Sequence, residues 1–100
     1  MASKKTTSIV RSSGNVFEDL GFSREEAEHL RLRSALMATI VKLIKVRNLT
    51  QAKAAALFGV SQPRISDLVR GKIDLFSIDT LIEMLARADI HVELRIPQVA

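Results

Sequence analysis

The sequence contains no cysteine, which excludes a disulfide framework, a thiolate metal site and a cysteine nucleophile. Its longest apolar stretches, around residues 36–44 and 54–60, are far shorter than the roughly 20 residues that a membrane-spanning helix needs. The N-terminus also lacks the apolar core of a secretion signal. These absences predict a cytoplasmic protein with no membrane partner.

Residues that could support catalysis or metal binding are also scarce. The only two histidines, His29 and His91, lie far apart and have no acidic partners at metal-ligand spacing. Glu25, Glu26 and Glu28 suit the positive end of a helix better than acid–base chemistry. Because there is also no glycine-rich phosphate loop and no nucleophile motif, we expect no enzyme activity, no metal and no cofactor.

Charge is distributed unevenly along the 100 residues, which are enough for one domain. Residues 34–73 carry seven basic side chains and one acidic side chain, whereas acidic groups outnumber basic ones over 15–33 and over 74–100. A cationic block favours a polyanionic partner, since each neutralised phosphate releases counterions. A solvated basic face would give the same pattern, so charge alone leaves both interpretations open.

A long helix is predicted over residues 24–46, which contain no proline or glycine. Ser23 and Glu26 form a capping box at its start, and Asn48 is a candidate left-handed cap after its end. A break near 31–34 is possible, because charge is concentrated in the first half. The residues expected to face the core are Leu36, Ile40, Leu43 and Ile44.

Two short helices separated by a sharp turn are predicted next. Thr50 caps the first, which runs through Phe58, and Gly59 ends it because glycine tolerates positive φ. Ser61 caps the second, which stops near Gly71 and carries Pro63 in its first turn, where the missing N–H costs little. The small Ala55 lets the helices cross, and the apolar pins are Ala54, Phe58, Val60, Ile65 and Leu68.

The remaining segments yield four further expectations. Residues 1–14 are rich in Ser, Thr and Lys and predict a flexible arm, with a possible short strand at its apolar pair, Ile9 and Val10. An apolar anchor follows, made of Val16, Phe17 and Leu20. A fourth helix, capped by Ser77 or Asp79, runs to about Ala88 and buries Leu81, Ile82 and Leu85. Alternation over 90–96 predicts a half-buried strand ended by Pro97.

A lone strand needs a partner, either the arm or the same strand of a second copy. A two-fold axis near Leu94 would place Glu93 opposite Arg95 of the second copy, twice, which is a favourable cross-strand pairing. We therefore expect a homodimer. Its expected interface residues are Ile90, Val92, Glu93, Leu94, Arg95 and Ile96.

Residues 49–72 closely resemble the helix-turn-helix of the phage-repressor-like XRE family of transcription regulators. The resemblance rests on the pattern Thr-Gln-Ala-x-x-Ala…Gly-Val-Ser-Gln…Ile-Ser…Gly-Lys. Over roughly 13–96 the chain also looks like the HigA-type antitoxin-like regulators, chiefly through the segment Val-Phe-Glu-Asp-Leu-Gly-Phe-Ser-Arg-Glu-Glu-Ala at 16–27. The implied fold is mainly α: a lambda-repressor-like helix-turn-helix bundle of about five helices, with a short C-terminal β-strand.

The resemblance also implies residue roles. The resemblance assigns base reading to five residues of the second short helix. Gln62 would bind adenine, Arg64 guanine or else a phosphate, and Pro63 a thymine methyl. Ser66 and Asp67 face the same groove, and Asp67 could accept a hydrogen bond from cytosine. Phosphate contacts are assigned to Thr50, Gln51, Ser61, Arg70 and Lys72. Each of these residues could instead be a solvated or capping residue, and Asp67 more readily so than the others.

These features predict a sequence-specific DNA-binding repressor, with double-stranded DNA as its partner. The expected homodimer would place two recognition helices about 34 Å apart on a near-palindromic operator. The resemblance extends this to an antitoxin that neutralises a RelE-like toxin and represses its own operon. There are two alternatives: a stand-alone repressor, and an interaction module that keeps the helix-turn-helix only as a scaffold. The corresponding domain organisation is an arm over 1–14, a helical domain over 15–89 with its helix-turn-helix at 50–71, and a dimerisation strand over 90–96.

Overall fold

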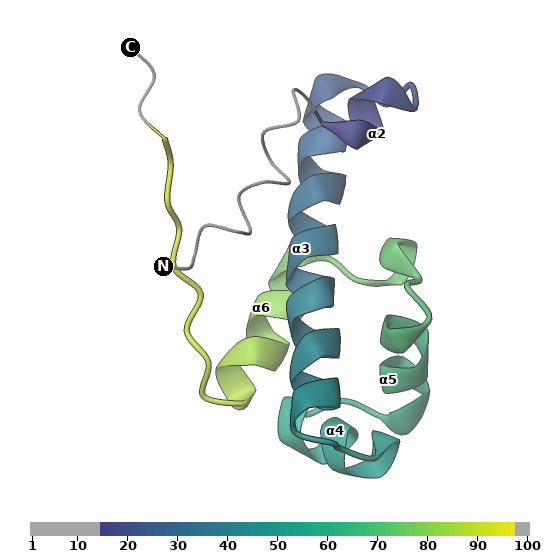
Figure 1. Ribbon diagram of the computed structural model, residues 1–100, viewed down its shortest axis with the longest axis vertical. Helices are drawn as coiled ribbons and strands as arrows, with labels where there is room; N and C mark the ends of the chain where they lie inside the picture. The colour runs from purple at the N-terminus through teal and green to yellow at the C-terminus, as the bar shows by residue number, and fades with distance from the viewer. Residues whose placement is uncertain (1–14, 98–100) are drawn as a thin grey trace.

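A computed structural model of the chain describes residues 15–97, and these form a bundle of five α-helices (Figure 1). The helices are α2 (Val16–Asp19), α3 (Arg24–Val46), α4 (Gln51–Phe58), α5 (Gln62–Val69) and α6 (Ile78–Arg87), with a 3-10 turn, η1 (Ile73–Leu75), between the last two. The long α3 forms the axis of the molecule, α2 lies beside its N-terminal end, and α4 crosses near its C-terminal end (Figure 1). The mainly α prediction is therefore confirmed, whereas α2 and η1 were not expected.

The α3 helix is continuous through residues 31–34, so the break considered there does not occur. At its start the backbone N–H of Glu26 donates to the hydroxyl of Ser23 at 3.1 Å, as the capping box predicts. After its end, Asn48 has φ of 54°, the left-handed geometry expected of it. One stripe of the helix is buried, formed by Ala27, Leu30, Met37, Ile40 and Ile44.

Short helices after α3 all begin with a hydroxyl cap. The hydroxyls of Thr50, Ser61 and Ser77 accept hydrogen bonds from the backbone N–H three residues later. Of the two caps considered for the fourth helix, the structure uses Ser77. Because each cap satisfies a backbone donor that no intrahelical carbonyl can reach, these helix starts are encoded locally.

Side chains from α3 to α6 meet in one core. The largest fully buried members include Phe58, Ile65, Leu68, Phe76 and Leu81. Ile82, expected to be buried, is 40% exposed, because it lies one residue past Leu81 and points about 100° away from the buried stripe of α6. Val60, predicted as a pin, is only half-buried.

The apolar anchor predicted at the start of the described chain is largely open to solvent. Val16 and Leu20 are 59% and 68% exposed, while Phe17 is half-buried and packs edge-on against Phe22. A helix of a single turn presents only one face to its neighbour, so α2 cannot bury all three residues. The side-chain amide of Asn15 donates to the carbonyl of Ala27 at 3.1 Å, which ties α2 to α3.

The β-strand predicted over 90–96 is wrong for the single chain. Residues 90–97 adopt no regular secondary structure, and Leu94 and Ile96 are more than 80% exposed. Alternating apolar residues form a strand only beside another strand, and residues 15–97 contain none. The arm and its possible strand at Ile9 and Val10 lie outside the described residues. Within 15–97, no helix has the length and apolar content needed to cross a membrane.

Candidate nucleic-acid interface

The turn between α4 and α5 has the geometry expected of a helix-turn-helix. Gly59 adopts φ of 73°, and the N–H groups of Gly59 and Val60 both donate to the carbonyl of Ala55, at 2.9 and 3.0 Å. This pair of bonds turns the chain sharply, and Ala55 is buried where the helices cross. A Cβ at Gly59 would lie 2.5 Å from the side chain of Arg87, so the position favours glycine for two reasons.

The α5 helix has an inner and an outer face. Ile65 and Leu68 are fully buried and hold it against the core. Of the predicted base readers, Gln62 and Pro63 are exposed, while Arg64, Ser66 and Asp67 are half-buried. Arg70, a predicted phosphate contact, is exposed. The helix thus presents its N-terminal turn to solvent, as a recognition helix must do to reach base edges.

Arg64 is committed to contacts within the protein. Its Nη1 donates to the carbonyl of Leu75 at 3.0 Å, and its guanidinium carbon lies 4.3 Å from the centre of the buried Phe76 ring. A cation above an aromatic face is attracted by the ring's negative surface. Arg64 therefore links α5 to the segment that follows η1, and the sequence reasoning did not anticipate this role.

Two other predicted DNA contacts are paired with each other. The Nζ of Lys72 lies 3.7 Å from a carboxylate oxygen of Asp67, whose side chain is 26% exposed. The pair reduces the charge that either residue presents to a ligand. It also agrees with the reservation that Asp67 is the weakest candidate for reading a base.

Of the remaining phosphate candidates, Arg70 is exposed at the C-terminal end of α5, and the other three stand at the exposed starts of the two helices. Thr50 and Ser61 accept capping bonds at 3.1 and 3.3 Å, which leaves each hydroxyl hydrogen free to donate. Gln51 follows the first cap and is exposed. Helix N-termini carry partial positive charge and unpaired N–H groups, so these positions suit phosphate oxygens.

Two further arginines support this interface, and the sequence analysis missed both. Arg33 on α3 donates to the carbonyl of Ile73 at 3.2 Å, and Arg87 on α6 donates to the carbonyl of Gly59 at 3.3 Å. Each bond joins residues at least 28 positions apart, so no local pattern indicates it. Arg87 thus holds the turn between α4 and α5, and Arg33 holds η1, which follows α5.

The family described as a helix-turn-helix domain matches residues 16–97. A solved structure described as an XRE family transcriptional regulator is 32% identical, with a TM-score of 0.68, over 74% of this chain and 83% of that one. No curated protein matches the chain. The XRE-type resemblance is confirmed, whereas the HigA-type assignment stays a prediction.

Proposed function

The chain belongs to the helix-turn-helix domain family, in its XRE type, and from this premise we propose that it binds double-stranded DNA as a sequence-specific transcriptional repressor. The observation that carries the proposal is the exposed first turn of α5 on a helix held by Ile65 and Leu68. Its place of action is accordingly the cytoplasm, on the chromosome. It needs no cofactor and catalyses no reaction.

In this proposal Gln62 is the principal base reader, forming two hydrogen bonds with an adenine. Pro63 contacts a thymine methyl, and Ser66 lies one turn further along the same helix. Of the two roles considered for Arg64, the contacts to Leu75 and Phe76 favour a phosphate contact that also fixes the loop. Asp67 tunes the site through its pair with Lys72 rather than through a base of its own.

Phosphates are held on both sides of this reading helix. Thr50, Gln51 and Ser61 contact one backbone segment, and Arg70 and Lys72 contact another. Such contacts set the register of the protein on the duplex but carry no sequence information. They also make the affinity fall steeply as salt rises.

We further propose that two copies bind a near-palindromic operator. The exposed Val92, Leu94 and Ile96 alternate with Glu93 and Arg95, which suits antiparallel pairing with the same residues of a second copy. Pairing would bury three apolar side chains that the single chain leaves in water. Ile90, at the start of the segment, is half-buried against the core and would anchor it.

The antitoxin role is a finer part of the proposal. Val16 and Leu20 are exposed next to the acidic Glu18 and Asp19, so α2 offers an apolar and anionic surface to a basic toxin. The HigA-type resemblance covers the same segment. If this role is correct, a small basic RelE-like protein encoded beside this gene will copurify with the chain, and Leu20→Glu will release it. A neighbouring gene of another kind favours a stand-alone repressor.

DNA binding is tested by fluorescence anisotropy on the DNA upstream of its own gene and on a scrambled duplex. We expect Gln62→Ala to reduce the ratio of the two affinities by roughly 5- to 150-fold, since a bidentate pair is worth about 1–3 kcal/mol. Arg64→Ala should instead weaken binding to both duplexes and lower stability. Glu83→Gln, at an exposed position of α6, is the control. Equal affinity of the wild-type chain for both duplexes would favour the scaffold alternative.

A further inference from the structure

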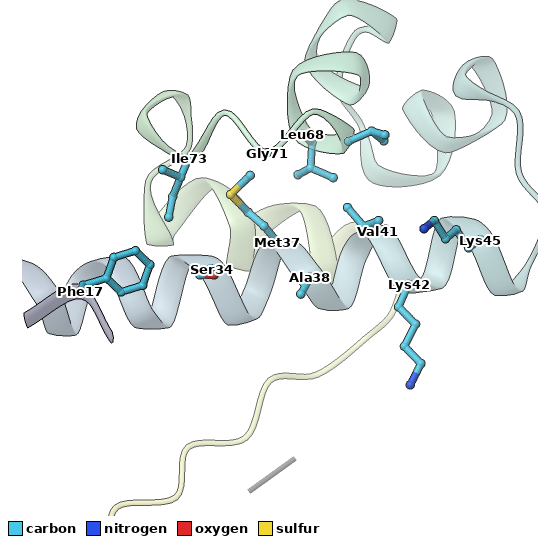
Figure 2. A pocket seen from close by; sticks show the side chains of 11 residues that line it. Phe17, Ser34, Met37, Ala38, Val41, Lys42, Lys45, Leu68, Gly71 and Ile73 are labelled. Carbon is cyan, nitrogen blue, oxygen red and sulfur yellow. The ribbon is translucent and has the colours of Figure 1, made fainter. Parts of the chain in front are cut away.

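An apolar groove of about 620 Å³ runs along α3 (Figure 2), and none of its lining residues belongs to the first turn of α5. Met37, Ala38 and Val41 of α3 form its floor. Leu68 and Ile73 lie across from them, and Phe17 lies at one end (Figure 2). A concave, mainly apolar volume of this size falls within the range of small-molecule sites, roughly 300–1,000 Å³.

The end of the groove away from Phe17 is cationic. Lys42 and Lys45 are both lining residues; the amine of Lys45 points back along α3 toward Val41, whereas the Lys42 side chain extends away from Leu68 and Ile73 (Figure 2). None of the described residues that line the groove is acidic, and Lys45 has no ion-pair partner within 15–97. An apolar trough with an ammonium group at one end is complementary to an amphiphilic anion.

Charge disfavours the N-terminal segment of this chain as the occupant. Residues 1–14 carry three basic and no acidic side chains, and the charged residues that line the groove, Lys42 and Lys45, are basic too.

We propose that this groove binds a small amphiphilic anion, an apolar chain or ring that ends in a carboxylate, and that the bound anion lowers operator affinity. The second half rests on the function proposed above. Val69 and Gly71 line the groove on either side of Arg70, the candidate phosphate contact. An anion held there adds negative charge beside the residues that would meet the DNA backbone, and it packs against the last turn of α5.

Binding itself is tested on the full chain with decanoate and with decanol, its uncharged counterpart. In a methyl NMR titration, we expect saturable shifts at Met37, Val41 and Val69. The exposed methyls of Val92 and Leu94 serve as internal controls and should stay unmoved. Shifts that do not saturate, or that are largest at Leu94, would overturn the site.

Variants separate the apolar and charged parts of the groove. Ala38 is exposed, so Ala38→Phe should fill the groove and weaken both ligands by roughly tenfold without changing the melting temperature. Lys45→Gln should weaken decanoate by roughly fivefold and leave decanol unchanged, while Lys53→Gln on α4 should affect neither. Equal effects of Lys45→Gln on both ligands would overturn the anion preference. A concentration-dependent dimer abolished by Ala38→Phe would assign the groove to a second copy instead.

Coupling is tested by repeating the DNA titration with saturating decanoate. We expect operator affinity to fall several-fold in the wild type and to stay constant in Ala38→Phe. Decanoate binding without any change in operator affinity overturns the coupling and leaves the site standing. If the unliganded chain fails to bind DNA at all, the proposed function fails, whereas the NMR titration still decides whether the groove binds the anion.

Discussion

The α4–α5 unit and the segment over 90–97 carry equally clear sequence patterns, yet only the first forms the predicted structure. In α4–α5, the caps, the left-handed glycine and the buried Phe58, Ile65 and Leu68 all lie where the pattern places them. Over 90–97, the alternation is as regular, but the residues form no ladder and Leu94 is 82% exposed.

The difference shows how far each pattern depends on distant parts of the chain. A helix satisfies its backbone within four residues, and its caps within three. A strand satisfies its backbone only on a neighbouring strand, so its pattern states a requirement without supplying the partner. Measurements of stability and self-association in both regions test this difference.

The largest expected difference in stability is between two variants that each truncate one large apolar side chain, one in each region. Phe58→Ala removes a fully buried ring and should lower the free energy of unfolding by about 3–5 kcal/mol. Leu94→Ala should change it by less than about 0.5 kcal/mol in the monomer. Chemical denaturation at low protein concentration measures both. A large loss for Leu94→Ala at that concentration would show that the segment packs within the single chain.

The next largest effect comes from replacing the left-handed glycine between α4 and α5, compared with the left-handed glycine after α5. Gly71→Ala introduces a Cβ at φ of 76° with no atom within 4 Å, so it should cost about 1–2 kcal/mol of backbone strain alone. Gly59→Ala has nearly the same φ but displaces Arg87 and its bond to Gly59, and should cost about 0.5–1 kcal/mol more. The excess should vanish in an Arg87→Ala background. Equal costs without that background would mean that Arg87 moves aside freely.

A smaller effect tests whether two copies of the chain pair through residues 90–97. Glu93→Lys replaces two proposed attractions with two repulsions and should weaken self-association by roughly 2- to 30-fold from the lost attractions alone, since each of the two cross-strand pairs is worth about 0.2–1 kcal/mol. Adding Arg95→Glu should restore it. Analytical ultracentrifugation gives the constants. A wild-type chain that stays monomeric at high concentration would contradict the dimer altogether.

The smallest expected effect concerns a surface ion pair outside both regions, between Glu28 and Arg31 on α3. A hydrogen bond from Arg31 holds the pKa of Glu28 below its ordinary value, against a weaker opposing effect of burial. Since the folded pKa is the lower one, the pair stabilises above about pH 4.5 and loses its contribution as pH falls through the folded value. We expect an NMR titration to show the lowered pKa, Arg31→Gln to remove it, and salt to weaken it. Because both side chains are largely exposed, stability should hardly change.

The residues of the candidate site show the same difference between local and long-range contacts. Thr50, Ser61, Gln62 and Pro63 stand where the sequence indicated, because helix starts and turns are read from adjacent residues. The placement of Arg64 was not predictable, because its partners, Leu75 and Phe76, belong to a segment whose path depends on η1 and α6.

The sequence by itself determined the helix boundaries after Ser23, the left-handed turns at Asn48 and Gly59, and the family, because these depend on contacts within a few residues. Tertiary structure alone decided which polar side chains remain free. It engages Arg33, Arg64 and Arg87 with distant carbonyls, opens a groove between α3 and the end of α5, and gives residues 90–97 no partner strand within 15–97. Those outcomes depend on which segments meet in space, which no local pattern of residues specifies.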